Sequence, residues 1–220
     1  MNIALIGYGK MGQLIEQIAL EKGHRISVIV NSINSIENQD FSSTDVAIDF
    51  STPNSAYHSI KCVLTQGIPV VSGTTAWLEN LDDVKQLAKE KAIGFLYASN
   101  FSIGVNLFFE LNKKLSQLMQ NQSEYKVSIK EIHHVEKLDM PSGTALSLQS
   151  QISNTINIVS ERTNNIPGTH IVNYDSEIDS ISITHKAHNR MGFAKGALIA
   201  AEWIISKIGV FSMRDVLSSS

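Results

Sequence analysis

Apolar residues gather in short runs along roughly the first half of the chain, and amphipathic segments separate these runs. The runs have the length of buried strands and lie at residues 3–6, 26–30, 46–50, 68–71 and 95–97. The segments between them place apolar side chains at helical spacing, over residues 11–22, 53–67 and 77–91. Strand and helix in alternation predict a parallel sheet with right-handed crossovers, which binds ligands at the carboxyl ends of its strands.

The pattern changes after Ser102. Helices are predicted at 105–119, from about 142 to 156, at 193–207 and at 212–217. Strands are predicted at 125–132, 170–174 and 179–185, the last two as a pair. Residues 160–169 are polar and include a Pro-Gly turn, so an irregular loop is expected there. This region predicts a second, α+β domain with a mainly antiparallel sheet.

A glycine-rich loop follows the first predicted strand and precedes the first predicted helix. Its residues are Gly7, Tyr8, Gly9, Lys10, Met11 and Gly12. Strand, G-x-G-x-x-G and helix in this order form the dinucleotide-binding fingerprint, in which the first glycine permits the turn, the second admits the pyrophosphate and the third packs the helix on the strand. We therefore expect an α/β, Rossmann-like domain that binds NADPH or NADH through these residues. A tight turn that binds nothing is the alternative.

The sequence departs from the fingerprint after the second strand. An acidic residue is expected there to hold the ribose hydroxyls, and it favours NAD because it repels a 2′-phosphate. Asn31 and Ser32 occupy this place. Lys10 could contact a 2′-phosphate or could be an ordinary surface charge. We predict that both nucleotides are accepted within roughly a hundredfold of each other.

Residues 131–145 concentrate groups that carry charge and protons. His133 and His134 end a predicted strand, Lys137 and Asp139 follow in a loop, and Ser142 or Thr144 can cap the next helix. A strand end, a polar loop and a helix N-terminus together are typical of anion binding and proton transfer. A metal site formed by His133, His134 and Asp139 is the alternative, but no third imidazole or thiol stands at a familiar spacing, so no metal is predicted.

The segment His-His-x-x-Lys-x-Asp-x-Pro-Ser-Gly-Thr-Ala at 133–145 resembles the signature of the bacterial dihydrodipicolinate reductase family. Further matching segments are Asp49-Phe-Ser51, Gly73-Thr-Thr75, Asn100-Phe-Ser102, Ile183-Thr-His-x-Ala187 and Arg190-x-x-Phe-Ala-x-Gly-Ala197. Two departures from the family concern the nucleotide side. The chain is shorter around 31–44 and 157–165, and its glycine loop is one residue tighter.

The resemblance implies NAD(P)H-dependent reduction of 4-hydroxy-tetrahydrodipicolinate, with loss of water, in the diaminopimelate and lysine pathway. His133 and Lys137 are the implied catalytic residues. The substrate carboxylates are assigned to His134, Ser142, Gly143 and Thr144. The nicotinamide side is assigned to Gly73, Thr74, Thr75, Ala98, Ser99, Asn100 and Phe101. Asp139 is expected to orient Lys137 or the loop rather than to react, and an ordinary turn residue before Met-Pro is the alternative.

The resemblance also implies the domain boundaries and the assembly. Residues 1–102 and 191–220 are expected to form the dinucleotide-binding domain, and 103–190 the substrate-binding and oligomerisation domain of a homotetramer. Independently of the family, Ile181 and Ile183 share one face of their strand, as Val172 and Tyr174 do. A small open sheet leaves a face or edge that needs cover, so we expect a charged residue at 181 or 183 to weaken assembly. A monomer with loop 157–169 folded over its own sheet is the alternative.

Composition excludes several classes of function and kinds of site. The chain has 220 residues, a net charge of −3 and one cysteine, so no nucleic-acid stripe, internal disulfide or multi-cysteine metal site is expected. No apolar run approaches the roughly 20 residues that span a bilayer, and the first residues lack the features of a signal peptide, which predicts a cytoplasmic protein. Two other function classes stay open: another two-domain Rossmann oxidoreductase, and a non-catalytic NAD(P)-sensing protein.

Overall fold

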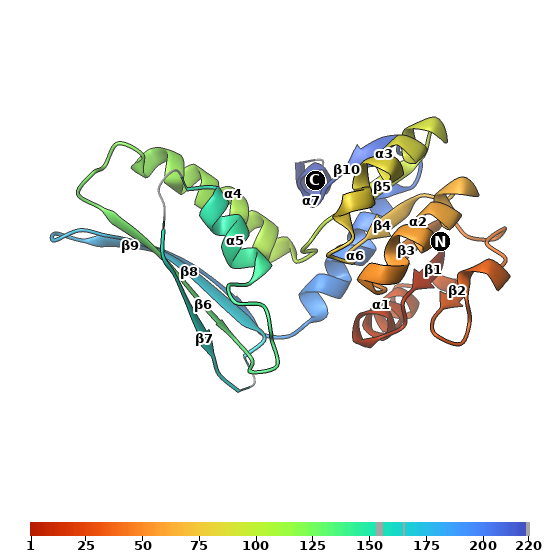
Figure 1. The fold of residues 1–220 in the computed structure, drawn as a ribbon, viewed down its shortest axis with the longest axis horizontal. Helices are drawn as coiled ribbons and strands as arrows, with labels where there is room; N and C mark the ends of the chain where they lie inside the picture. Colours follow the sequence, from red (N-terminus) through yellow and green to blue (C-terminus); the bar gives the residue numbers. More distant parts are fainter. Residues whose placement is uncertain (153–155, 165, 219–220) are drawn as a thin grey trace. The chain divides into compact units, whose positions relative to one another are not determined.

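The computed structural model describes residues 1–152, 156–164 and 166–218. The chain divides into two compact units (Figure 1). The first consists of Met1–Ser102 and Phe193–Ser220, and the second of Ile103–Gly192. The return to the first unit therefore falls at Phe193 rather than at residue 191.

The first unit contains a six-stranded, wholly parallel sheet with the order β10-β5-β4-β3-β1-β2. Its strands are β1 Asn2–Ile6, β2 Arg25–Val30, β3 Val46–Asp49, β4 Val70–Ser72, β5 Gly94–Tyr97 and β10 Gly209–Phe211. Every residue of β3 and of β4 is buried, as expected for strands that are covered on both faces. The predicted parallel sheet is confirmed, and β10 is a strand that the sequence reasoning missed.

The strand order reverses between β1 and β3. The chain moves outward from β1 to β2 and then returns to pair β3 on the other side of β1. A crevice opens at the carboxyl ends of the strands where such a reversal occurs. The glycine loop after β1 and the Phe50–Ser51 segment after β3 both lie at this point.

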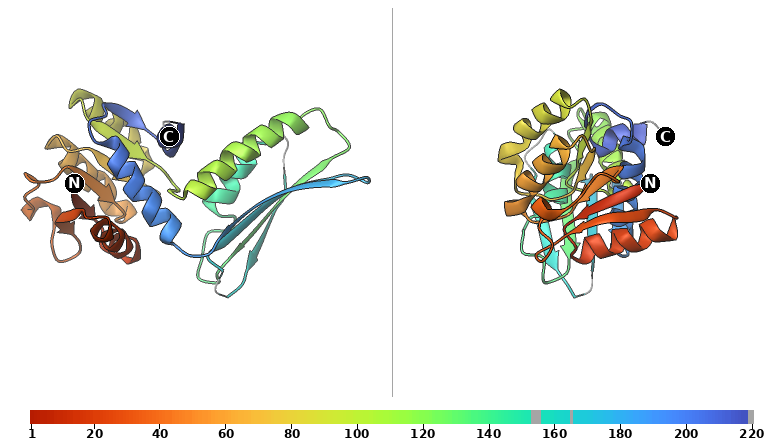
Figure 2. Two further views of the ribbon diagram at one scale, coloured as in Figure 1. Left: turned by 180° about the vertical axis from the view of Figure 1, so that it is seen from behind. Right: turned by 90° about the vertical axis from the view of Figure 1, so that its right-hand side faces the viewer.

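Helices cover both faces of this sheet (Figure 2). They are α1 Lys10–Glu21, α2 Pro53–Thr65, α3 Leu81–Glu90, α6 Met191–Ile204 and α7 Met213–Ser218, with short 3-10 turns η1 Ile36–Asn38 and η2 Leu78–Asn80. α2 and α3 pack together on one face, where Ile60 and Val84 join the core. On the other face Lys22 after α1 forms an ion pair of 2.9 Å with Glu202 of α6.

The second unit contains a four-stranded sheet with the order β7-β6-β8-β9. Its elements are α4 Ile103–Met119, β6 Lys126–His133, α5 Gly143–Ser150, β7 Ile158–Arg162, β8 Gly168–Asp175 and β9 Ser180–Ala187. β7 pairs parallel to β6 and the other pairs are antiparallel, which confirms a mainly antiparallel sheet. Part of the prediction of an irregular loop at 160–169 is wrong, because residues 160–162 belong to β7. This segment has few apolar residues and is a strand because it pairs with β6. α5 ends earlier than predicted, and residues 153–155 lie outside the described residues.

The helices α4 and α5 lie on one face of this sheet (Figure 1). The core beneath them contains Phe108, Ile129, Leu148 and Val172. Ile183 pairs with Val172 and packs against this same core. Ile183 is therefore partly covered from within the chain, while Ile181 on the same face is exposed. The expectation that a charged residue at 181 or 183 weakens assembly stays a prediction. Among the described helices, none has both the length and the apolar character needed to cross a bilayer.

Candidate active site

The glycine loop is fixed by contacts that only glycine allows. Gly7 has φ +88°, and a Cβ on it would lie 2.3 Å from the carbonyl oxygen of Phe50. A Cβ on Gly12 would lie 2.3 Å from the carbonyl oxygen of Gly7. A Cβ on Gly9, in contrast, would meet no atom within 4 Å. The first and third glycines thus hold the loop against its neighbours, and the second leaves the open surface that a pyrophosphate needs.

The N-terminus of α1 is available to an anion. α1 starts at Lys10 after Gly9, and among the described residues no side-chain hydrogen bond caps it and no acidic residue lies in its first turn. Unpaired N–H groups and the helix dipole favour a negatively charged ligand at such an end. The loop and helix together therefore fit a dinucleotide phosphate.

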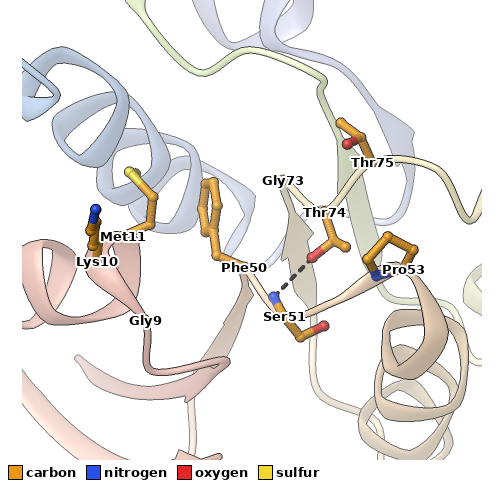
Figure 3. A pocket seen from close by; sticks show the side chains of 9 residues that line it. All are labelled: Gly9, Lys10, Met11, Phe50, Ser51, Pro53, Gly73, Thr74 and Thr75. Atoms are coloured by element: carbon orange, nitrogen blue, oxygen red, sulfur yellow. Dashed lines mark hydrogen bonds between the residues drawn. The ribbon is translucent and has the colours of Figure 1, made fainter. Parts of the chain in front are cut away.

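Two cavities adjoin this loop. The smaller, of about 440 Å³, is lined by Gly9, Lys10, Met11, Phe50, Ser51, Pro53, Gly73, Thr74 and Thr75 (Figure 3). The larger, of about 610 Å³, extends from Gly7, Tyr8 and Gly9 past the end of β2. Both are lined by Gly9, Phe50 and Ser51, so the two cavities adjoin at these residues. Two adjoining cavities beside the glycine loop suit the two halves of a dinucleotide.

A buried carboxylate ties the loops of β3 and β4 together beside the smaller cavity. Asp49 is fully buried and accepts hydrogen bonds from the hydroxyls of Ser51 (2.6 Å) and Ser72 (2.8 Å). The Ser51 N–H donates to the Thr74 hydroxyl at 2.9 Å (Figure 3). Burial raises the pKa of Asp49, and these hydrogen bonds oppose the rise. The network holds Gly73, Thr74 and Thr75 at the cavity wall, and their contact with the nicotinamide stays a prediction.

The predicted contact residues after β5 do not line either cavity. Phe101 contacts the cavity only indirectly, because its ring packs on that of Phe50 at 5.6 Å between centroids. The side-chain oxygen of Asn100 accepts a hydrogen bond from the N–H of Ser102 at 2.9 Å. A nicotinamide contact for Ala98, Ser99, Asn100 and Phe101 therefore stays a prediction.

In the second unit a buried glutamate gathers the polar groups. Glu131 and His133 are two residues apart on β6, so they share a face, and His170 lies opposite Glu131 on β8. Glu131 is fully buried, and His133 and His170 are 5% and 4% exposed. One carboxylate oxygen of Glu131 lies 3.4 Å from His133 Nδ1 and 3.8 Å from His170 Nε2. A side chain at Gly168 would come within 3.0 Å of His133 Nε2, so this glycine leaves room for the ring.

Ser142 links this glutamate to the start of α5. Its N–H donates to both carboxylate oxygens of Glu131 at 3.1 Å, and its hydroxyl lies 3.2 Å from His170 Nε2. As the predicted N-cap, the same hydroxyl accepts a hydrogen bond from the Ala145 N–H. Gly143 and Thr144 form the first turn of α5, and His134 directly follows β6.

Arg162 fastens the signature loop to the sheet. Its guanidinium lies 3.4 Å from Glu131 Oε1 and donates to the backbone oxygens of Lys137 (3.1 Å) and Asp139 (2.6 Å). Sequence reasoning missed this residue because it assigned residue 162 to an irregular loop. Arg162 lies on β7, and the pairing of β7 with β6 brings its side chain next to Glu131. The local sequence pattern does not predict this pairing.

Lys137 and Asp139 form an ion pair within the loop. The Lys137 ammonium lies 2.7 and 2.9 Å from the two carboxylate oxygens of Asp139. Burial alone would raise the pKa of Asp139, but the hydrogen bond and charge of Lys137, together with backbone N–H groups, lower it. A charged carboxylate that holds the ammonium supports the interpretation of Asp139 as the group that orients Lys137.

Burial shapes the charges of the histidines. Desolvation lowers the pKa of His133, helped by the charges of Lys137 and Arg162 and opposed by Glu131. Desolvation and the charge of His133 lower the pKa of His170 to about 4. Burial alone would raise the pKa of Glu131, but the hydrogen bonds from Ser142 lower it. The glutamate therefore stays ionised among neutral imidazoles.

The same three side chains could in principle hold a metal, since ligand atoms of Glu131, His133 and His170 lie within 4.8 Å of one another. The predicted alternative ligands, His134 and Asp139, do not belong to this group. The carboxylate of Glu131 already faces the guanidinium of Arg162 and the N–H of Ser142. A metal cation bound here would be repelled by the guanidinium of Arg162, so these side chains suit proton handling better than metal binding.

Comparison with known proteins identifies the family. Residues 1–101 match the family described as "Dihydrodipicolinate reductase, N-terminus", and residues 104–217 match "Dihydrodipicolinate reductase, C-terminus". This chain belongs to the dihydrodipicolinate reductase family. The resemblance found in the signature is thereby confirmed over nearly the whole chain.

Relatives in this family match the chain end to end. It is 48% identical over 236 residues to the 4-hydroxy-tetrahydrodipicolinate reductase of Christiangramia forsetii, covering 99% of this chain and 98% of that protein. It is 34% identical over 223 residues to the enzyme of the same name from Thermosipho africanus, covering 100% and 99%. The structure of dipicolinate-bound dihydrodipicolinate reductase from Paenisporosarcina sp. TG-14 shares the fold, with a TM-score of 0.77, 21% identity and coverage of 96% and 97%.

Proposed function

We propose that the protein reduces 4-hydroxy-tetrahydrodipicolinate to tetrahydrodipicolinate with NAD(P)H and loses water in the process. The observation that carries this proposal is the buried pair of Glu131 and His133 beside the Lys137 loop, on a chain of the reductase family. Membership of this family favours the reductase over a sugar dehydrogenase or a nucleotide sensor. A sensor would need neither His133 nor Lys137.

The nucleotide is assigned to the first unit. Gly7 and Gly12 shape the loop, the open face of Gly9 admits the pyrophosphate, and the N-terminus of α1 holds its charge. Bound NAD(P)H supplies the hydride. Gly73, Thr74 and Thr75 line the smaller cavity, which suits the nicotinamide half.

The groups that act on the substrate are assigned to the second unit. Lys137 offers a positive charge toward the ring nitrogen and the charge that develops on reduction. His133 donates the proton that the reduced carbon framework requires. His134, Ser142 and the backbone of Gly143 and Thr144 at the start of α5 hold the carboxylates.

The lowered pKa of His133 bears on this role. A histidine whose pKa lies below 6.5 is mainly neutral at pH 7, so the donor form is a minority in the free protein. A dicarboxylate that binds beside it adds negative charge, which favours the imidazolium. Substrate binding therefore charges the proton donor where the proton is needed.

Either nucleotide fits the fingerprint, and we propose that NADH and NADPH both serve. Lys10 lines the smaller cavity and not the larger cavity beside Asn31 and Ser32. A 2′-phosphate beside the end of β2 would therefore not depend on Lys10.

We further propose a cytoplasmic homotetramer assembled through the second unit. The side of its sheet opposite α4 and α5 carries mainly polar side chains together with Ile132 and Ile171, which alternate with the buried residues of β6 and β8. Light scattering tests the assembly, since a mass near 24.2 kDa would end this proposal. Recovery of the protein in a membrane or exported fraction of the cell would contradict the location.

A coupled absorbance assay tests the reaction. The purified protein is mixed with NADH or NADPH and a pyruvate-derived cyclic substrate generated in the cuvette, and loss of the nicotinamide absorbance is followed. We expect oxidation that depends on the substrate. Lys137→Gln should reduce it, and the matched change Lys130→Gln, at an exposed lysine paired with Glu161, should not. Nucleotide binding without substrate-dependent oxidation would refute the proposed activity.

A further inference from the structure

The larger cavity ends at an acidic side chain that the nucleotide fingerprint does not predict. The cavity runs from the glycine loop past Val30 and Asn31 to Glu37 of η1 and His58 of α2. Glu37 is the acidic residue among those that line it. In the fingerprint geometry the adenosine ribose lies beside the end of the second strand, which is the region this cavity occupies.

Asn31 is not free to replace the missing acid. Its side-chain oxygen accepts hydrogen bonds from the N–H groups of Ile33 and Asn34, both at 2.8 Å. The oxygen therefore closes the turn after β2 rather than facing a ligand. Ser32 offers an uncharged hydroxyl. Neither residue supplies a negative charge or a strong acceptor.

Glu37 is held in place at the cavity wall. The side chain of Ile36 is buried in the core and anchors η1. From the facing helix α2, His58 Nε2 lies 2.7 Å from Glu37 Oε1. The backbone of Glu37 and the side chains of His58 and Ser35 lower the pKa of Glu37, so the carboxylate is charged at neutral pH.

We propose that Glu37 sets the preference between the two nucleotides in favour of NADH. Its carboxylate accepts hydrogen bonds from the ribose hydroxyls and repels a 2′-phosphate, which is the work that the fingerprint normally assigns to the end of the second strand. The chain thus supplies this acid from the 3-10 turn that follows Asn31. The inference rests on the proposed nucleotide site and deepens it.

The size of the preference follows from the exposure of the acid. The side chains of Glu37 and His58 are 58% and 65% exposed, so water and salt screen the carboxylate. We expect that removing the charge lowers the ratio of NADH to NADPH affinity by about tenfold, rather than by several orders of magnitude. NADPH therefore remains usable, and the preference lies within the range expected from the sequence.

Direct binding separates this inference from the reaction. Calorimetric titrations of ADP-ribose and 2′-phospho-ADP-ribose need no substrate and no turnover. The wild type should bind ADP-ribose more tightly, and Glu37→Gln should lower the ratio about tenfold, by weakening ADP-ribose and strengthening the phosphorylated ligand. Glu202→Gln is the matched control, because Glu202 also pairs with a histidine, His24 at 2.9 Å, and does not line the cavity.

Salt supplies a second readout. Charge repulsion is screened at high ionic strength, so the preference of the wild type for ADP-ribose should shrink from about 50 mM to about 500 mM salt, and that of the variant should change less.

An unchanged ratio of the two affinities in Glu37→Gln, or tighter binding of the phosphorylated ligand by the wild type, would overturn the inference. Glu37-dependent binding without substrate-dependent oxidation would refute the proposed activity and leave the inference standing. Failure of both ligands to bind would refute the nucleotide site itself.

Discussion

In the unit formed by Met1–Ser102 and Phe193–Ser220, the glycine loop and the segments around it border open space. In Ile103–Gly192, charged side chains contact one another instead. A Cβ on Gly9 would meet nothing within 4 Å, and two cavities adjoin the loop. Glu131 is fully buried among Ser142, Arg162 and His133. The first arrangement suits the binding of a large ligand, and the second suits the control of charge.

The contrast has an energetic side. Loss of a ligand contact in the first unit lowers the affinity for the ligand but leaves the packing of the fold unchanged. Loss of one charge in the second unit leaves another charge buried without its partner, which is costly to the fold itself. Changes in the second unit should therefore affect both chemistry and stability.

The largest effect is expected at His133. We expect His133→Gln to lower kcat about 10²–10⁴-fold, because general acid catalysis contributes on this scale. Binding of NADH should stay unchanged, since the nucleotide is assigned to the other unit. Steady-state kinetics and a separate titration with NADH measure the two quantities.

The pH profile sharpens this prediction. The value of kcat/KM reports the free protein, where burial lowers the pKa of His133. It should therefore fall as the pH rises, from a midpoint below 6.5, and this fall should vanish in the variant. A kcat that survives the substitution would remove His133 from the mechanism.

A smaller effect, on stability, is expected at Glu131. Glu131→Gln leaves Arg162 without its buried partner and should lower the free energy of unfolding by about 3 kcal/mol. The matched control is Glu161→Gln, which breaks the exposed ion pair with Lys130 and should cost at most about 1 kcal/mol. Both pairs belong to the β6–β7 region of one sheet, so the comparison isolates burial.

The measurement can assign the loss to one unit. Both tryptophans, Trp77 and Trp203, lie in the first unit. Amide hydrogen exchange of β6 and β8 should therefore accelerate in Glu131→Gln while the tryptophan fluorescence transition stays in place. Equal costs for the two substitutions would contradict the view that burial makes the Glu131 network sensitive.

The same contrast explains what the sequence could predict. The glycine loop is contiguous, so the fingerprint predicts it from the sequence alone: Gly7 and Gly12 are required by close contacts, and Gly9 leaves open space for a ligand. The parallel sheet followed from the alternation of apolar runs and helical segments. β10 was missed because its three residues, Gly209–Phe211, are too short to form a pattern.

The buried network escaped prediction for a different reason. Glu131 and His133 share a strand face, and that much can be seen in the sequence. Their contacts with Arg162 and His170 depend on the register of β7 and β8 against β6. Residues about 30 to 40 positions apart meet only after this pairing, and no local spacing encodes it. Glu37 was overlooked similarly, because its cavity is completed by α2.

The smallest of the three effects concerns acid stability and His170. Its pKa is about 4 in the folded protein and near 6.5 when it is unfolded, so folding releases a proton between these values. The stabilisation from keeping His170 neutral is full above pH 6.5 and is lost as the pH falls toward 4. From pH 7 to pH 5 the free energy of unfolding of the second unit should fall by about 2 kcal/mol through this residue.

His170→Gln, which keeps a hydrogen-bonding side chain beside Ser142, should remove that part of the loss, and His188→Gln, at an exposed histidine, should not. Some acid sensitivity should persist in His170→Gln, because burial also lowers the pKa of His133. Hydrogen exchange of β8 at a series of pH values measures the difference, and identical pH slopes in wild type and His170→Gln would show that this histidine is not kept neutral by the fold.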